Sequence, residues 1–173
     1  LDAEALVRSG ENTFVVAFER QHRLWEYRGL LSRPNSIDIP KKILALPHNS
    51  GIESLVQLQV GKFLAIAEAG TVDKQFFALL ITSSDVVELS YPYDDYFRPS
   101  DAALYSDGKV LVLERGYNTN AGVAARLMLL RLEQAGDSIS ISRTLAVELG
   151  HRIPMDNFEG LAFVQVLAAE SFL

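Results

Sequence analysis

Acidic residues recur at the start of short apolar runs in this 173-residue chain, although acids are depleted in strands. Four segments share the pattern, namely DAEALV, GIESLVQL, PSDAALYS and NFEGLAFV, and their acids are Glu4, Glu53, Asp101 and Glu159. By subtraction of their positions, these acids lie 49, 48 and 58 residues apart. A period near fifty residues indicates a repeated supersecondary unit.

A second acid follows the first in each unit. FVVAFER, FLAIAEAG and VLVLERG run from apolar residues into Glu19, Glu68 and Glu114, which lie 15, 15 and 13 residues after the first acids. This spacing is typical of a hairpin between two adjacent strands. The fourth unit offers Glu170 at a spacing of 11. Whether the second set faces the same opening as the first depends on strand register, so both arrangements stay open.

The units that must position these acids each contain four short apolar runs. In the third unit they are AALYS, VLVLER, ARLMLLRL and ISISRTLAVEL, separated by Asp-Gly and Gly-Asp turn signals. The second unit has SLVQL, KFLAIAE, QFFALLIT and VVELSY, and the first has EALV, TFVVAFE, RLWEYRG and a final KKILAL. The alternative for AARLMLLRLEQA is an amphipathic helix in a helical-repeat solenoid, but the other units lack a helical counterpart.

Tandem four-stranded units of this length predict an all-β, β-propeller-like fold in which each unit is a blade. We expect approximate blades at 2–50, 51–98 and 99–156, with a partial blade at 157–173, in one domain or a portion of one. Propellers use four to eight blades, so three and the start of another predict an incomplete propeller.

A propeller gives the first acids a shared position, because the first strand of each blade lines the central channel. Glu4, Glu53, Asp101 and Glu159 are then expected to form one ring. Carboxylates brought this close repel, and they stay ionised only when cations or hydrogen-bond donors compensate. Ca²⁺, which takes six to eight oxygen ligands in irregular geometry, is the metal that this ring predicts.

The same ring predicts catalytic candidates: Glu53, Glu159, Arg20, Arg115 and His48. Calcium would neutralise a phosphate ester and orient a water molecule, while an arginine directly after a repeated Glu could grip phosphate oxygens. In the structural alternative, each Glu-Arg pair alternates across its strand and forms salt bridges between blades. His48, with Asn49, precedes a channel-facing acid and either reaches substrate or caps a loop. The loop YPYDDYFRPSD forms either a pocket wall or packing between blades.

Composition excludes several other classes of function. A formal net charge of −6 disfavours nucleic acid or an anionic membrane as the partner, and the absence of cysteine excludes disulfides and thiolate chemistry. No apolar run is long enough to span a membrane. His22, His48 and His151 lack the close spacing of a zinc motif, and no serine-nucleophile elbow, P-loop, EF-hand or dinucleotide fingerprint occurs. The oligomeric state stays open.

Several stretches together resemble one family: DNFEGLAF, HNSGIESL, RPSDAALYSDGKVLVLERGY, and DAEALV with VVAFERQHRLWEY. They are similar to the bacterial phytase-like group described as "esterase-like activity of phytase", over about residues 2–163. The resemblance implies a propeller-like fold, a periplasmic or secreted location, and a small-molecule ester or phosphoester substrate. True propeller phytases hold calcium with acidic residues, but this chain has no stretch that matches theirs.

Two classes of function follow. The first is an exported, metal-assisted hydrolase of phosphate or other esters that uses the carboxylate ring. The second is a non-catalytic propeller that binds a ligand or protein at its funnel. A lactonase-like, metal-dependent hydrolase is a further alternative with the same ring.

Overall fold

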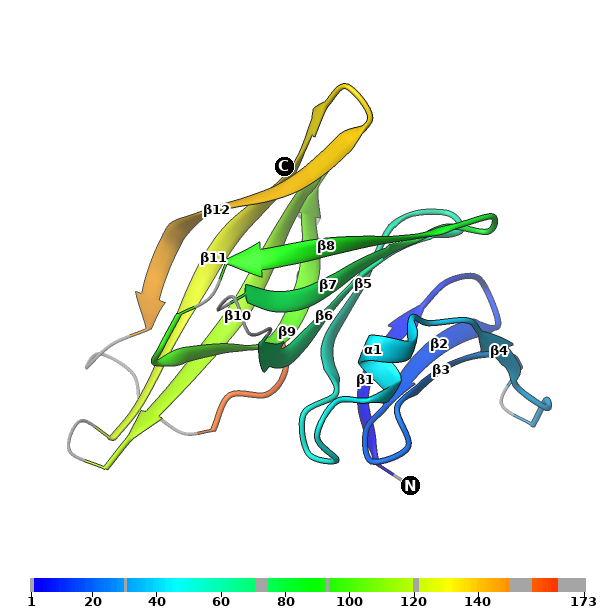
Figure 1. Ribbon diagram of the computed structural model, residues 1–173, viewed down its shortest axis with the longest axis horizontal. Helices are drawn as coiled ribbons and strands as arrows, with labels where there is room; N and C mark the ends of the chain where they lie inside the picture. The colour runs from blue at the N-terminus through cyan, green and yellow to red at the C-terminus, as the bar shows by residue number, and fades with distance from the viewer. Residues whose placement is uncertain are drawn as a thin grey trace, which may run out of the picture.

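The structure is a computed structural model of the chain, and it describes residues 2–29, 31–70, 75–92, 94–119, 122–149 and 157–164. These residues form an all-β protein with twelve strands and one short helix (Figure 1). The strands make three separate four-stranded antiparallel sheets, each formed by strands consecutive in the sequence. The predicted four-stranded units are therefore present in all three cases. No helix in the described part of the chain is long and apolar enough to cross a membrane.

The first sheet contains β1 (Ala3–Arg8), β2 (Thr13–Phe18), β3 (Arg23–Arg28) and β4 (Asn35–Ile37). Its last strand was expected at KKILAL, and this prediction is wrong: Lys41–Leu44 is helix α1. The proline at position 40, with φ −58°, suits the start of a helix. Ile43 is buried, whereas the residues two positions away, at 41 and 45, are exposed, so this run does not bury alternate residues as a strand would.

The second sheet contains β5 (Ile52–Gln59), β6 (Lys62–Gly70), β7 (Gln75–Ile81) and β8 (Val86–Pro92). The third contains β9 (Phe97–Ser106), β10 (Lys109–Asn118), β11 (Gly122–Ala135) and β12 (Ser138–Leu149). The helical alternative for residues 124–135 is wrong, because they lie in β11 and pair with both β10 and β12. Gly108 and Gly136 supply the predicted turns, with φ of 67° and 61°.

Two apolar clusters hold the sheets together, and β6 contributes side chains to both of them. Leu64 and Ile66 belong to the cluster that the second and third sheets share. Phe63 and Ala65 belong to the cluster shared with the first sheet and with Ile43 of α1. Successive side chains of a strand point to opposite faces, so a strand buried on both faces needs an unbroken apolar run. This explains why KFLAIA contains almost no polar residue.

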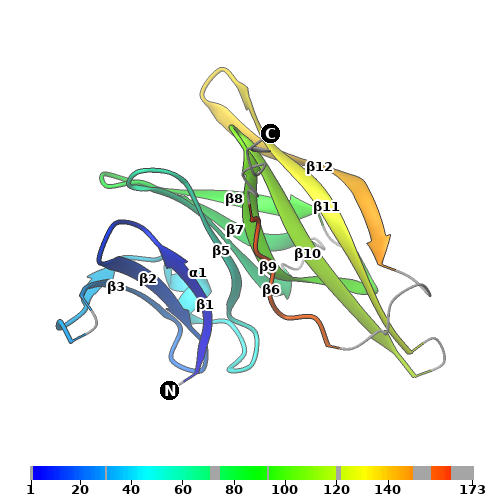
Figure 2. The ribbon, with the colours of Figure 1, turned by 180° about the vertical axis from the view of Figure 1, so that it is seen from behind.

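The first strands of the three sheets lie side by side in the order β1, β5, β9 (Figure 2). Residues 157–164 continue this row beside β9, where the Leu161 amide donates to Asp101 Oδ2 at 2.6 Å and Ser100 Oγ donates to the Phe158 carbonyl at 3.3 Å. The rings of Tyr105 and Phe163 pack edge to face, with centroids 5.4 Å apart. The expected partial fourth unit is thus described at its start only, and Glu170 and His151 lie outside the described residues.

Candidate carboxylate site

Five carboxylates line one cavity of about 380 Å³ where the row of first strands begins. We call it the acid cavity, and its ionisable residues are Glu4, Glu19, Glu53, Glu68, Glu159 and Arg115. Ala3, Asn49 and Ser100 complete its lining. Three of the four first acids therefore come together, as do two of the three second acids. Among the lining residues, one guanidinium faces five carboxyl groups.

β-Bulges aim the first acids into this cavity. In the first sheet the register shifts between Ala3 and Ala5, so Glu4 is an extra residue in β1. In the second sheet the shift falls between Ile52 and Ser54, so Glu53 is the extra residue. A bulge leaves its residue out of the ladder and redirects its side chain, and bulges are enriched next to active sites.

The third sheet also has a bulge in its first strand, but the extra residue there is a serine and not an acid. Its register shifts opposite Leu113 and Glu114, which pair with Asp101 and Pro99, so the extra residue is Ser100. Ser100 lines the acid cavity, whereas Asp101 lines a neighbouring cavity of about 310 Å³ between β1, β5 and β9. There, the Asp101 carboxylate accepts the amide protons of Leu161 and Ala102, at 2.6 and 2.7 Å. The structure therefore brings Asp101 into a different cavity from the other three first acids.

The same offset places Arg115, and not Glu114, at the acid cavity. In each sheet, the second strand has one residue that pairs with the residue just before the bulge: Phe18, Ala67 and Glu114. The residue after it lines the acid cavity, and this residue is Glu19, Glu68 and Arg115 in turn. From bulge residue to cavity residue the spacing is 15 in every sheet, by subtraction of positions 4 from 19, 53 from 68 and 100 from 115. A search for constant spacing, irrespective of residue type, would have found Ser100 and Arg115.

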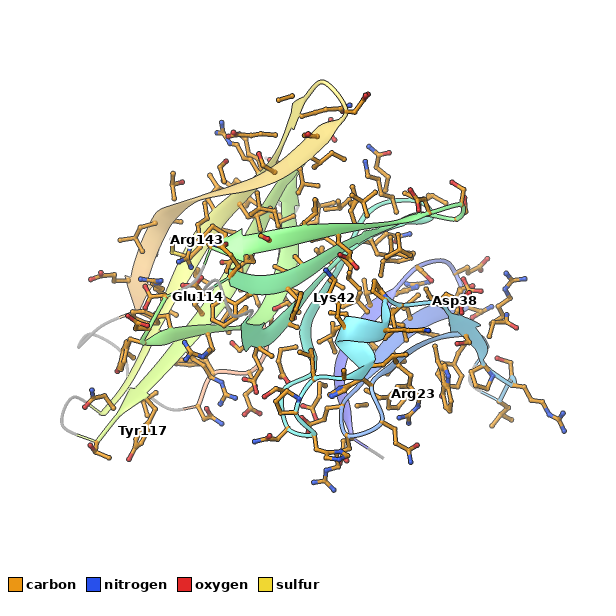
Figure 3. All side chains as sticks on the ribbon, viewed as in Figure 1. Arg23, Asp38, Lys42, Glu114, Tyr117 and Arg143 are labelled. Atoms are coloured by element: carbon orange, nitrogen blue, oxygen red, sulfur yellow. The ribbon has the colours of Figure 1, made fainter. Side chains whose placement is uncertain are left out.

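Glu114 lies one residue earlier and points into the interior, where it is fully buried. Its carboxylate accepts from Tyr91 Oη at 2.7 Å, from Arg126 Nε at 2.6 Å, and from Arg143 Nη1 (Figure 3). Arg126 also bonds Asp94 at 2.9 Å. This network joins β8, β10, β11 and β12, so Glu114 has a structural environment unlike that of Glu19 and Glu68.

The environment of the acid cavity raises the pKa of several of its carboxyl groups. Burial, together with the charges of Glu68, Glu4 and Glu19, raises the pKa of Glu53 to about 8 from an ordinary 4.5, and Arg115 opposes this only in part. Burial also raises the pKa of Glu68, with Arg115 and Arg98 acting against it and Glu19 adding to it. For Glu4, burial and Glu19 raise the pKa. Near neutral pH, Glu53 thus carries a proton that an exposed glutamate would have lost.

Arg115 connects the acid cavity to residues 157–164. Its Nη1 donates to Glu159 Oε1 at 3.1 Å and also to Asn157 Oδ1. Asn157 Nδ2 donates to the same Glu159 oxygen at 2.5 Å. These contacts hold Glu159 at the rim, with an exposed side chain.

The remaining candidates lie outside the lining of the acid cavity. Arg20 is 68% exposed and pairs with Asp2 at 2.8 Å, and its φ of 58° belongs to the loop after β2. His48 Nδ1 donates to the Arg20 carbonyl at 2.9 Å, and the Arg20 amide donates back to the His48 carbonyl at 2.9 Å. His48 therefore braces two loops, and its neighbour Asn49 is the residue that reaches the cavity.

Within the described ranges, no group of three or more His, Cys, Asp or Glu side chains is arranged so that it could hold a metal ion as it stands. The carboxylates share a cavity without converging on one point. A further cavity, of about 800 Å³, lies between β3, β4 and the second sheet, and three of its charged groups, Glu26, Arg28 and Asp85, have local partners. Glu26 accepts from Arg28 at 2.9 Å, and Asp85 accepts the Val86 amide proton at 2.8 Å. The acid cavity therefore remains the main candidate for chemistry.

Comparison with known proteins identifies the family of this chain. No curated protein matches the chain, and no solved structure matches it either. One family model matches residues 1–172, and its description is "Phytase-like: Esterase-like activity of phytase". Because this match covers nearly the whole sequence, the chain belongs to the phytase-like family.

Proposed function

We propose that this protein is a metal-assisted hydrolase of phosphate or other esters, and that the acid cavity is its reaction site. The observation that carries the proposal is the cavity's charge: five carboxyl groups share about 380 Å³ with one guanidinium. Membership of a family described by esterase-like activity of phytase supports the reaction class.

The donor chemistry of the acid cavity fits Ca²⁺. Its lining offers carboxylate oxygens, the Asn49 side chain and the Ser100 hydroxyl, with no nitrogen or sulfur ligand of the kind that zinc prefers. Glu4, Glu53 and Glu68 would hold the ion together with Glu19. When bound, calcium supplies positive charge that neutralises an anionic ester and polarises water.

The residues of the chain supply the remaining roles. Glu53, with its pKa near 8, holds a proton at neutral pH until the ion binds, and it would give that proton up when it becomes a ligand. Arg115 lies between the carboxylates and the exposed rim, where its guanidinium can donate to an ester or phosphate oxygen. Asn49 adds a neutral donor and acceptor at the same cavity.

We also propose that the three sheets are successive blades of a β-propeller-like arrangement, with the acid cavity at one mouth of its channel. The side-by-side order of β1, β5 and β9, which residues 157–164 extend, supports this (Figure 2). The family supports action in the periplasm or outside the cell, where calcium is available.

Calorimetric titration of the chelator-stripped protein with Ca²⁺ tests the site, with Glu53→Gln/Glu68→Gln as the variant and Glu11→Gln/Glu133→Gln as the matched control. We expect binding in the parent and the control and none in the variant. Turnover of 4-nitrophenyl phosphate and 4-nitrophenyl acetate, with and without Ca²⁺, then tests the reaction. Calcium binding without turnover of any ester would favour a non-catalytic binding protein, and unchanged calcium binding in the variant would refute the site.

A further inference from the structure

A second cavity, of about 610 Å³, shares a wall with the acid cavity. Glu68 and Arg115 line both of them. The lining of the second cavity also includes Asp95, Arg98, Tyr96 and Tyr117, and we call it the arginine cavity. Its volume lies within the usual range for small-molecule sites. Nothing in the proposed function so far uses it.

Two arginines of the arginine cavity face each other across neighbouring strands. Arg98 on β9 and Arg115 on β10 are directly paired in register. Both guanidinium groups act against the rise in the pKa of Glu68, which places their positive charge at the boundary between the two cavities. Guanidinium groups bind oxyanions through paired hydrogen bonds.

Packing and hydrogen bonds hold the Tyr96 ring in the wall of the arginine cavity. The Tyr96 ring lies so close to Gly116 that a Cβ on that glycine would be 2.5 Å from the ring. Tyr96 Oη donates to the Gly122 carbonyl at 3.0 Å, and the Tyr96 amide donates to Asp94 Oδ1 at 2.9 Å. Arg126 holds the other oxygen of Asp94 at 2.9 Å. The buried network of Glu114 thus fixes this wall.

Tyr117 contributes a second ring to the lining of the arginine cavity. It is 71% exposed and lies near the outer end of β10 (Figure 3). An exposed aromatic ring that lines a cavity can stack on a planar ligand at a small entropic cost. The arginine cavity thus combines two guanidinium groups with two tyrosine rings.

We infer that the arginine cavity binds an aromatic oxyanion, with its charged group between Arg98 and Arg115 and its ring against Tyr96 and Tyr117. This inference deepens the proposed function and rests on it for one point only: the bound group would be the part of the ester that lies next to the reacting bond. The substrate class is then an ester of an aromatic carboxylic or phosphoric acid. Binding itself needs neither calcium nor turnover.

The probe is phenylphosphonate, which carries a ring and an oxyanion and cannot be hydrolysed as an ester. Its binding is measured by calorimetry with a chelator present, beside methylphosphonate, which lacks the ring, and phenol, which lacks the charge. We expect phenylphosphonate to bind about tenfold or more tightly than either. Tyr117→Ala and Arg98→Lys should each weaken it about tenfold. Tyr105→Ala and Arg131→Lys, exposed residues away from the cavity, should leave it unchanged.

Equal affinity for phenylphosphonate and methylphosphonate would overturn the inference, as would binding that needs Ca²⁺ and ignores Tyr117→Ala. Because Tyr117 is largely exposed, its replacement leaves the fold intact, and thermal melting checks this. Binding of phenylphosphonate without hydrolysis of any ester would refute the hydrolase proposal alone. Hydrolysis of esters without phenylphosphonate binding would refute the arginine cavity alone.

Discussion

Glu53 and Glu68 line the same cavity from the paired strands β5 and β6, and the charge of Glu68 helps to raise the pKa of Glu53. A bulge makes this possible, because it takes Glu53 out of the ladder and redirects its side chain into the cavity. Glu68 directly follows Ala67, the residue of β6 that pairs at this bulge. Burial removes water from the same carboxyl group, so the two effects act in one direction. Stability is therefore linked to the protonation of this pair.

The stability of the protein should fall as the pH rises from about 4.5 to about 8. In that window the folded protein keeps the proton on Glu53, whereas the unfolded chain has lost it, so the folded state binds more protons. Glu53→Gln removes this dependence. We expect thermal melting to show that the variant gains more over the parent at pH 8.5 than at pH 5. Glu11→Gln, in an exposed turn, is the control, and an equal gain at both pH values would contradict the prediction.

Calcium affinity should rise with pH and level off above about pH 8, because the ion must displace the proton of Glu53. If one proton is released for each ion, affinity changes about tenfold per pH unit below that point. Calorimetry at pH 6, 7, 8 and 9 measures the trend, and buffers of different ionisation enthalpy count the protons. An affinity independent of pH would show that Glu53 takes no part in binding.

Glu114→Gln should destabilise the fold by about 3–5 kcal/mol, because it leaves Arg126 and Arg143 without their buried counter-charge. Urea denaturation followed by fluorescence measures the free energy of unfolding. Glu133→Gln, on the exposed end of β11, should change it little. If Glu114→Gln lowered the free energy of unfolding no more than this control, the network would not contribute to stability.

Gly51→Ala should cost about 1–3 kcal/mol through overpacking. An added Cβ would lie 2.9 Å from Glu19 Cβ and 3.3 Å from its Cα, so the backbone that carries Glu19 must move. We expect weaker calcium binding together with a lower melting temperature. Gly160→Ala, where a Cβ meets nothing within 4 Å, is the control. A variant as stable as this control would mean that the loop adjusts freely.

The four-stranded units were predictable from sequence because alternating apolar runs and Asp-Gly or Gly-Asp turns are local signals. The end of the first unit was not. KKILAL ends in an apolar run like those of the predicted strands, but Lys, Leu and Ala favour a helix, and a preceding proline and a single buried isoleucine accompany the helical turn at its start. Its packing against the first two sheets, which involves residues distant in sequence, decided its form.

The candidate site divides in the same way. The motifs shared with the family, the repeat of about fifty residues and the acids Glu4, Glu53 and Glu159 could all be predicted from the residues alone. The folded chain was needed to show that Ser100 and Arg115 line this cavity in place of Asp101 and Glu114. The cause is strand register: moving a bulge by one residue sends the next side chain to the opposite face of the strand, and no residue type indicates that shift.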